Sequence, residues 1–370
     1  MANHFVTVKE FARTALPRLM EHLVFPNLIY KDFSDDFASM KGDTVQVRKP
    51  VVFSAREFDA AQGVSTSDIV ESTVDVSLDK IATVDVGVEA LQGATSMDDM
   101  TRLFVEPAAA ALAQKINQDG MQLYQDVFNH VGIAGVTPAT LDAFANARKA
   151  LNRQKAPVSG RAALWDPEAD AAFTALDPIV HAEKCGSVLA LREGAIGRVM
   201  GMDNYMSQAV CRHTAGSLAA ASGDITVSGA HTAGGDALTL TGTTLTGTLK
   251  KGDLIDVAGG SFTVTHDAAV AEGKIVCRVA PALPALSGGE KVSLAGSHTA
   301  NLCFHPMAFA FVTRPLPAPG GVESYTTSYN GVSLRVVRGY DMKYKREMLS
   351  MDVLYGFKTL YPELAVRVLG

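Results

Sequence analysis

Apolar residues recur at helical spacing in four stretches of the chain. From Phe11 to Leu23 they repeat every three or four positions, which predicts a helix over residues 7–24. Pro17 lies inside this stretch and should kink the helix or split it in two. The same spacing predicts three further helices, over residues 96–130, 137–154 and 167–176.

Other stretches alternate apolar and polar residues, the pattern of half-buried strands. Strands are predicted at residues 44–48, 73–78 and 84–88. Residues 60–68, between the first two, are mostly Gly, Ser, Thr and Gln or acidic. We therefore expect a long two-stranded excursion with a polar tip. A lone hairpin is marginally stable in water, so the excursion should lie against another surface.

The composition changes at about His213. Residues 213–300 hold 14 of the 32 glycines, nearly twice an even share. No helical stripe occurs there, whereas short alternating runs surround Leu238, Phe262 and Cys277. Short strands at regular spacing with glycine turns predict a small all-β domain, a sandwich or barrel, inserted into the rest of the chain.

Longer strands are expected after Leu302. Residues 332–337 and 349–355 should be two strands of one sheet, and the apolar run 365–369 should be packed. The densest basic segment runs from Arg335 to Arg346. We interpret it as a sheet edge facing solvent or another subunit, because lysine and arginine protect edge strands. A nucleic-acid patch is the alternative.

The composition narrows the function classes. The chain has 370 residues, of which 47% are hydrophobic and 19% charged, with a net charge of −6. The acidic balance disfavours a dedicated nucleic-acid binder, and the low charge density indicates that part of the surface meets other protein. We find no signal peptide or membrane span, and four scattered cysteines that predict reduced thiols in the cytosol.

Few residues point to chemistry. The chain contains no P-loop, dinucleotide-binding, zincin or nucleophile-elbow motif. Asp98 and Asp99 are expected in a first helical turn, where the helix dipole favours acids. His298 and His305 flank Cys303 at a spacing that a metal could use, but a strand junction explains them better. We therefore predict no catalytic, cofactor or metal residues and no enzyme activity.

Several segments, in chain order, resemble the coat proteins of tailed bacteriophages. The segment 111–117 is similar to that family's spine helix, although the family often has Asp where this chain has Asn117. Residues 250–259 resemble a strand of an insertion found in one branch. The matching stretches are GDTVQVRKP at 42–50, ALAQKIN at 111–117, GAIGRVMGMD at 194–203, KKGDLIDVAG at 250–259, NLCFHPMAFA at 301–310, YD at 340–341, LYG at 354–356 and PELAV at 362–366.

The resemblance implies an α+β fold, the Hong Kong 97-type capsid fold. The branch is that of the short-tailed Salmonella phage coat proteins, with an inserted β-barrel domain. The implied divisions are an N-terminal arm at 1–45, an extended loop with peripheral-domain strands at 46–95, a spine helix at 96–136, an axial domain at 137–212, the inserted barrel at 213–300, and the return to the axial domain with the closing peripheral strands at 301–370.

The implied function is that of a major capsid protein of a tailed double-stranded DNA phage or prophage. Copies would form pentamers and hexamers that close into an icosahedral shell in the virion, assembled in the bacterial cytoplasm. Expected partners are other copies, a scaffolding protein, a portal, a possible decoration protein and weakly held DNA, with no membrane and no cofactor. Intersubunit contacts are expected on the extended loop, at Arg56, Glu57, Asp59, Gln62, Asp68 and Glu71.

Two alternatives stay open at this stage. An encapsulin-like compartment would share the fold but package cargo enzymes, and it is disfavoured because the insertion resembles the phage branch. A hydrolase with a β-sandwich appendage is the third hypothesis.

Overall fold

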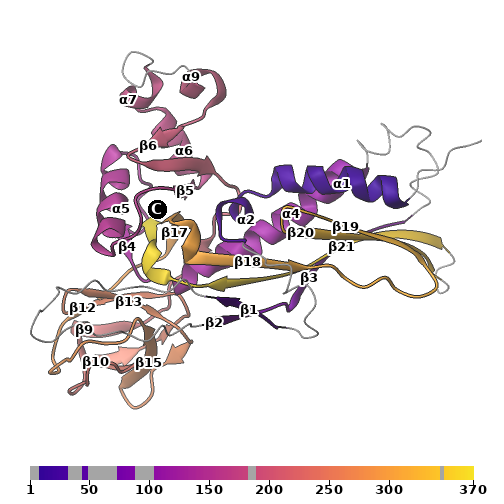
Figure 1. The fold of residues 1–370 in the computed structure, drawn as a ribbon. Coiled ribbons are helices and arrows are strands. Elements are labelled where there is room, and N and C mark those ends of the chain that lie inside the picture. Colours follow the sequence, from indigo (N-terminus) through magenta and orange to yellow (C-terminus); the bar gives the residue numbers. More distant parts are fainter. Residues whose placement is uncertain (1–7, 32–43, 49–72, 88–103, 182–188, 342–345) are drawn as a thin grey trace, which may run out of the picture. The chain divides into compact units, whose positions relative to one another are not determined.

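A computed structural model describes all residues except 1–7, 32–43, 49–72, 88–103, 182–188 and 342–345 (Figure 1). The described residues form a mixed α+β structure. Its contacts define two compact units. Unit 1 holds Met1–Met20, Lys31–Leu112 and Ala310–Leu360, and unit 2 holds Glu21–Tyr30, Ala113–Phe309 and Tyr361–Gly370. The division falls within helices α1 (Val8–His22) and α4 (Glu106–Met121).

The main sheet of unit 1 is built around its longest strand, β21. Leu349, Met351 and Val353 alternate along β21 and are buried, so one face of the sheet is apolar. The strand order is β18 (Phe309–Arg314), β21 (Arg346–Thr359), β20 (Val332–Asp341) and β19 (Glu323–Tyr329), and β3 (Lys80–Gly87) also pairs with β21. Figure 1 shows β19, β20 and β21 running side by side.

The opposite face of this sheet is polar. Arg335 on β20 lies directly across from Asp352 on β21, and its guanidinium donates to the carboxylate at 2.6 and 3.0 Å. The same guanidinium donates to the backbone carbonyl of Pro317 at 2.9 Å. The interpretation of the basic segment as a sheet edge is therefore wrong at Arg335, because β20 lies between β19 and β21.

A second, two-stranded sheet brackets residues 49–72. Strands β1 (Thr44–Arg48) and β2 (Thr73–Ser77) pair antiparallel from Thr44↔Ser77 to Arg48↔Thr73. This ladder confirms the paired base of the predicted excursion, whose polar tip lies outside the described residues.

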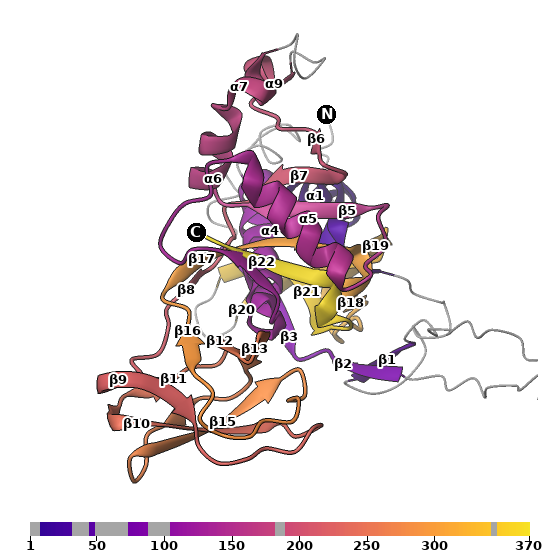
Figure 2. The same cartoon turned by 90° about the vertical axis from the view of Figure 1, so that its left-hand side faces the viewer.

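The first sheet of unit 2 mixes parallel and antiparallel pairs. Its order is β4 (His130–Gly132), β22 (Ala365–Leu369), β17 (His298–Phe304), β5 (Arg161–Trp165), β7 (Met202–Met206) and β6 (Arg198–Val199). Helix α5 (Leu141–Arg153) lies against this sheet (Figure 2). Its residues Phe144, Ala147 and Leu151 are buried in the apolar core there. The short helices α6 (Pro167–Thr174), α7 (Asp177–Val180) and α9 (Leu189–Glu193) follow along the chain.

An aromatic cluster fixes α5 and α6 on this sheet. Trp165 is fully buried on β5, and its ring centroid lies 5.1 Å from that of Phe144 and 4.8 Å from that of Phe173. Its indole N–H donates to Asn204 Oδ1 at 2.9 Å.

The glycine-rich segment forms a separate all-β segment of unit 2. We use this name for the chain between β8 (Arg212–His213) and β17. Alternate residues of β15, Ile275, Cys277 and Val279, enter an apolar core of sixteen buried residues. The strands run in the order β16 (Val292–Leu294), β12 (Leu254–Val257), β13 (Gly260–Val264), β15 (Lys274–Ala280), β10 (Ala237–Thr246) and β9 (Ala219–Val227), and β11 (Thr248–Leu249) pairs with β14 (Ala268–Ala269).

Several predicted helices need correction. Helix α1 confirms the first one, but it is continuous through Pro17 and is not split. Helix α4 begins at Glu106 and gives way to the 3-10 helix η4 (Gln122–Asp126) instead of reaching residue 130, and the predicted start at residue 96 lies outside the described residues. Residues 137–154 and 167–176 contain α5 and α6, each shorter than predicted.

No helix in the described ranges is long and apolar enough to cross a membrane.

Candidate functional site

The residues predicted to make intersubunit contacts fall outside the described ranges. All six belong to the segment 49–72: Arg56, Glu57, Asp59, Gln62, Asp68 and Glu71. Asp98 and Asp99 are outside as well. Their roles stay predictions.

The residues considered for metal binding are separated along one strand. His298 begins β17 and His305 follows its last residue, so the seven-residue strand holds them about 20 Å apart at the usual rise per residue. They cannot share one ion. Cys303 is fully buried between them, and burial raises the pKa of its thiol far above the ordinary value, so it is no nucleophile. Among the described residues, no group of three or more His, Cys, Asp or Glu side chains could hold a metal.

A different cluster lies where the all-β segment joins the first sheet of unit 2; we call it the polar junction. Strands β8 and β17, which lead into and out of the all-β segment, pair antiparallel there with His213 opposite His298. Both imidazoles are buried, and their centroids are 5.2 Å apart. Buried polar side chains need hydrogen-bond partners, so the partners of these two histidines determine how the junction is held.

His213 bridges two parts of unit 2. Its Nε2 lies 2.7 Å from Asp253 Oδ1, and its Nδ1 lies 3.0 Å from the hydroxyl of Tyr124 on η4. An ionised carboxylate only accepts hydrogen bonds, so Nε2–H donates to Asp253. In neutral His213, Nδ1 then accepts from the Tyr124 hydroxyl. The imidazole therefore ties η4 to the turn that carries Asp253.

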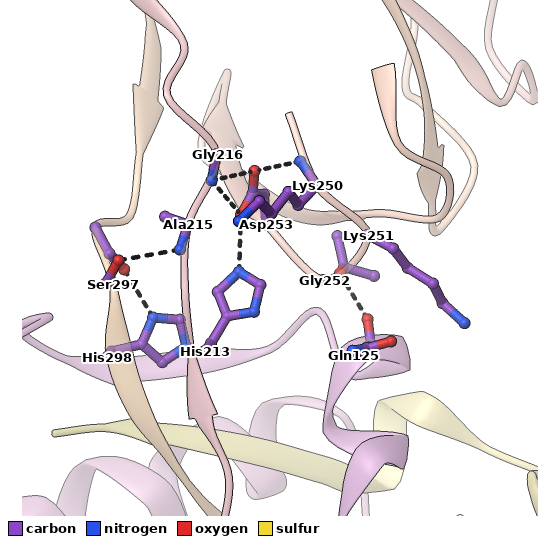
Figure 3. A network of polar contacts seen from close by, with 12 residues as sticks. Gln125, His213, Ala215, Gly216, Lys250, Lys251, Gly252, Asp253, Ser297 and His298 are labelled. Atoms are coloured by element: carbon purple, nitrogen blue, oxygen red, sulfur yellow. Dashed lines mark hydrogen bonds and ion pairs between the residues drawn. The ribbon is translucent and has the colours of Figure 1, made fainter. Parts of the chain in front are cut away.

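Asp253 organises that turn. Its carboxylate accepts from the backbone N–H groups of Lys250 at 2.7 Å and Gly216 at 3.1 Å, in addition to His213 (Figure 3). Two glycines allow the backbone to pack this closely around Asp253. A Cβ on Gly216 would meet the backbone of Thr248 and the Asp253 carboxylate, and Gly252 has φ +93° with Gln125 and His213 against the place of a Cβ.

Arg367 on β22 supplies the cation of the junction, and none of its hydrogen-bond acceptors among the described residues is a carboxylate. Its guanidinium is fully buried and donates to the backbone carbonyls of Val127 and Gly252, each at 2.8 Å, and to Thr263 Oγ1 at 3.1 Å. It also lies 5.3 Å from the centre of the Tyr124 ring, an arrangement typical of a cation–π contact. Burial lowers the pKa of Arg367 to about 9, so the side chain is still charged at neutral pH.

His298 has fewer partners than His213. Its Nδ1 lies 2.8 Å from the carbonyl oxygen of Gly296 and therefore carries the proton, while Nε2 has no hydrogen-bond partner among the described residues. Burial lowers the pKa of His298 to about 4, and the nearby charge of Arg367 adds to that effect. His298 is neutral at physiological pH.

The polar junction can hold segments together, but it offers no reacting group to a substrate. Its side chains are buried and joined to one another, and they come from η4, β8, the turn 250–253, β17 and β22. The sequence did not predict this cluster. Residues 250–259 were expected to form one strand, whereas Lys250–Asp253 is a turn and β12 begins at Leu254. The available signal was Arg367, a lone charge in the apolar strand Ala365–Leu369.

Comparisons with known proteins give structural similarity only. No protein-family model matches the chain, and no curated protein matches it. A structure of Mycobacterium phage Che8 is similar over 94% of this chain and 90% of that chain, at 18% identity and a TM-score of 0.49. A capsid structure of the cyanophage P-SCSP1u is similar over 94% and 88%, at 12% identity and a TM-score of 0.49. A virus-like particle from Pyrococcus furiosus is similar over 98% of both chains, at 9% identity and a TM-score of 0.43.

Proposed function

We propose that this chain is the major capsid protein of a tailed double-stranded DNA phage or prophage, with the Hong Kong 97-type fold. Copies would assemble as pentamers and hexamers into an icosahedral shell, formed in the host bacterial cytoplasm and kept in the virion. The chain would act as a structural protein and not as an enzyme.

The observation that carries this proposal is the order of the elements along the chain. An N-terminal helix comes first, then the β1–β2 ladder around residues 49–72, the helix α4, the sheet-and-helix part of unit 2 and the all-β segment. The chain then returns through β17 to the long strands β20 and β21. This is the order that the sequence resemblance implies for N-terminal arm, extended loop, spine helix, axial domain, insertion and return.

The finer assignment to the branch with an inserted β-barrel has its own support. The outer strands of the six-stranded sheet approach each other, because Thr226 at the end of β9 forms a bridge with Lys291 next to β16. Two backbone hydrogen bonds, Val227 N–H to the Glu290 carbonyl and Gly289 N–H to the Val227 carbonyl, extend this approach. A sheet whose edges meet in this way has the arrangement that a small closed barrel requires.

The remaining partners follow from the proposed role. A shell of this kind would need a scaffolding protein, a portal and a packaging motor, and decoration proteins could bind outside it. Contacts with packaged DNA would be weak and independent of sequence. Each subunit contact is repeated many times, so weak individual contacts suffice for a stable shell.

The experiment is assembly of the purified full chain, observed by electron microscopy and sedimentation. We expect capsomers or closed shells from the natural sequence. Deleting residues 60–68 should leave a folded subunit that assembles poorly, because these residues form the tip of the proposed extended loop. A Gly-Ser replacement of the same nine positions is the matched control, since it keeps chain length and removes only the side chains.

Normal closed shells from the deletion would contradict the loop assignment, and a monomer under all conditions would contradict the capsid proposal. The encapsulin-like alternative is separated by the contents of particles made in the native host. DNA of one defined length supports the phage capsid, whereas a co-purifying enzyme without DNA supports the compartment.

A further inference from the structure

The two histidines of the polar junction differ in how they can respond to acid. His213 has a partner for each ring nitrogen, Asp253 and the Tyr124 hydroxyl. If His213 takes up a second proton, Nε2–H still donates to Asp253 and Nδ1–H donates to the lone pairs of the Tyr124 hydroxyl. The bridge made by His213 is therefore compatible with both charge states.

His298 lacks this compatibility. Its Nδ1 already donates to the Gly296 carbonyl, so an added proton goes to Nε2. That nitrogen is buried and has no acceptor among the described residues. A buried N–H without an acceptor is costly, and a buried charge without a counter-charge is more costly still. Protonation therefore favours an arrangement in which water reaches the ring.

The charges around His298 reinforce this difference. The groups that face the polar junction are His213 on β8, Tyr124 on η4, Asp253 in the turn before β12, Arg367 on β22, and His130 on β4, which lies 3.2 Å from Asp256 on β12. Arg367, His213 and His130 all disfavour a positive charge on His298. The one buried carboxylate of the junction, Asp253, is already engaged by His213 and two backbone N–H groups.

His298 lies at a strand pair, so the cost of protonating it acts on the pairing of the two strands. His298 and His213 form the register pair of the two strands that connect the all-β segment to the first sheet of unit 2. Solvating His298 requires this pair to separate. We propose that the β8–β17 pair is an acid-sensitive latch, in which protonation of His298 separates the two paired strands locally while His213 keeps its contacts with Asp253 and Tyr124.

The sign of the effect follows from proton linkage. The latched state binds a proton on His298 more weakly than the open state, so the latched fraction decreases as the pH falls from the ordinary pKa of 6.5 toward the lowered value of about 4. With an ordinary pKa in the open state, the equilibrium moves toward opening by roughly 20-fold between pH 7 and pH 5.

Hydrogen–deuterium exchange of the full chain at pH 7 and pH 5 tests the latch. After correction for intrinsic exchange, we expect the protection of amides near residues 212–216 and 297–299 to fall by roughly 20-fold at pH 5. His298→Asn should abolish this response, because its amide can still donate to the Gly296 carbonyl but does not titrate. The matched control is His266→Asn, an exposed histidine of the same all-β segment, which should keep the natural response.

The latch is overturned if the natural chain and His298→Asn lose protection equally between the two pH values, or if neither does. Should His298→Asn fail to fold at pH 7, histidine-labelled natural chain decides the question by NMR. An imidazole of His298 that titrates near its ordinary pKa while the junction amides stay protected overturns the proposal. Titration that accompanies loss of protection supports it.

Discussion

At the scale of single residues, Asn117 on α4 occupies a buried position that needs both a hydrogen-bond donor and an acceptor. Its Oδ1 accepts from the backbone N–H groups of Val24 at 3.2 Å and Phe25 at 3.3 Å. Its Nδ2 donates to the carbonyl of His22 at 3.0 Å. The side chain thus satisfies both the end of α1 and the start of α2 (Phe25–Leu28). A carboxylate can accept, but it cannot donate.

We therefore expect Asn117→Asp to lower the free energy of unfolding by about 1–2 kcal/mol at pH 7, the cost of a carbonyl left without its donor and facing a charge. The deficit should shrink as the pH falls toward the pKa of the new carboxyl, because a protonated carboxyl regains a donor. Urea unfolding of the full chain at several pH values measures it. Gln118→Glu, which adds the same charge on the exposed side of α4, is the control, and an equal effect from it would contradict the explanation.

Arg367 is the second residue whose substitution should lower the stability of the fold. Arg367→Ala leaves the Val127 and Gly252 carbonyls and Thr263 Oγ1 without their donor in a buried site. We expect a loss of about 3–5 kcal/mol in the free energy of unfolding, in the range seen when buried polar networks are broken. Arg278→Ala, whose side chain is mostly exposed, should change it by less than about 0.5 kcal/mol. Similar urea midpoints for the two variants would contradict a structural role for Arg367.

At the scale of elements, the spacing of apolar residues predicted those helices and strands that depend on the local sequence. Helix α1 and the alternating strands of the all-β segment were identified because each buries one face at a fixed spacing. Pairing across the chain was not predictable in this way. The basic segment has the composition of an edge strand, but in the folded chain β19 pairs with β20 on its outer side. Arg335 therefore lies inside the sheet, where it donates to Asp352. Residues 250–253 look like the start of a strand until Asp253 is seen to accept from Lys250 and Gly216.

The polar junction was missed for the same reason. Its members come from positions between Tyr124 and Arg367, and the partners of His213 lie 89 and 40 residues away. No short motif connects such residues. A charge within an apolar strand was the one local sign of it, because burying a guanidinium demands several acceptors that only the folded chain brings together.

The all-β segment is an element whose independence can be tested. Its sixteen buried core residues lie between Leu218 and Val292, and its strands pair among themselves. We expect residues 214–300, expressed alone, to give a β-type circular dichroism spectrum and dispersed amide resonances. Isolation removes the contacts of Asp253 with His213 and of Gly252 with Arg367, so the fragment should be less stable than the same segment in the full chain. A random-coil spectrum would refute autonomous folding.

At the scale of the whole molecule, charge limits what the proposed shell can do with DNA. The chain carries a net charge of −6, and its densest basic segment has five positive side chains between Arg335 and Arg346. Arg335 is committed to Asp352 and the Pro317 carbonyl, which leaves at most four side chains of that segment for phosphates. Release of counterions from four phosphate contacts gives a salt slope of about −4 on a double-logarithmic plot.

We therefore expect unassembled subunits to bind double-stranded DNA weakly, without sequence preference, and to lose most of that binding between low and physiological salt. Dense arginine contacts of the kind that wrap DNA on histones are not available from this segment, so packaging would depend on a separate motor. Gel-shift titrations at several salt concentrations measure the slope, with a scrambled sequence as competitor. Arg335→Gln should leave the slope unchanged, because Arg335 already has its partners. Tight binding at physiological salt, or a preference among sequences, would mean that the chain has a nucleic-acid site beyond this basic segment.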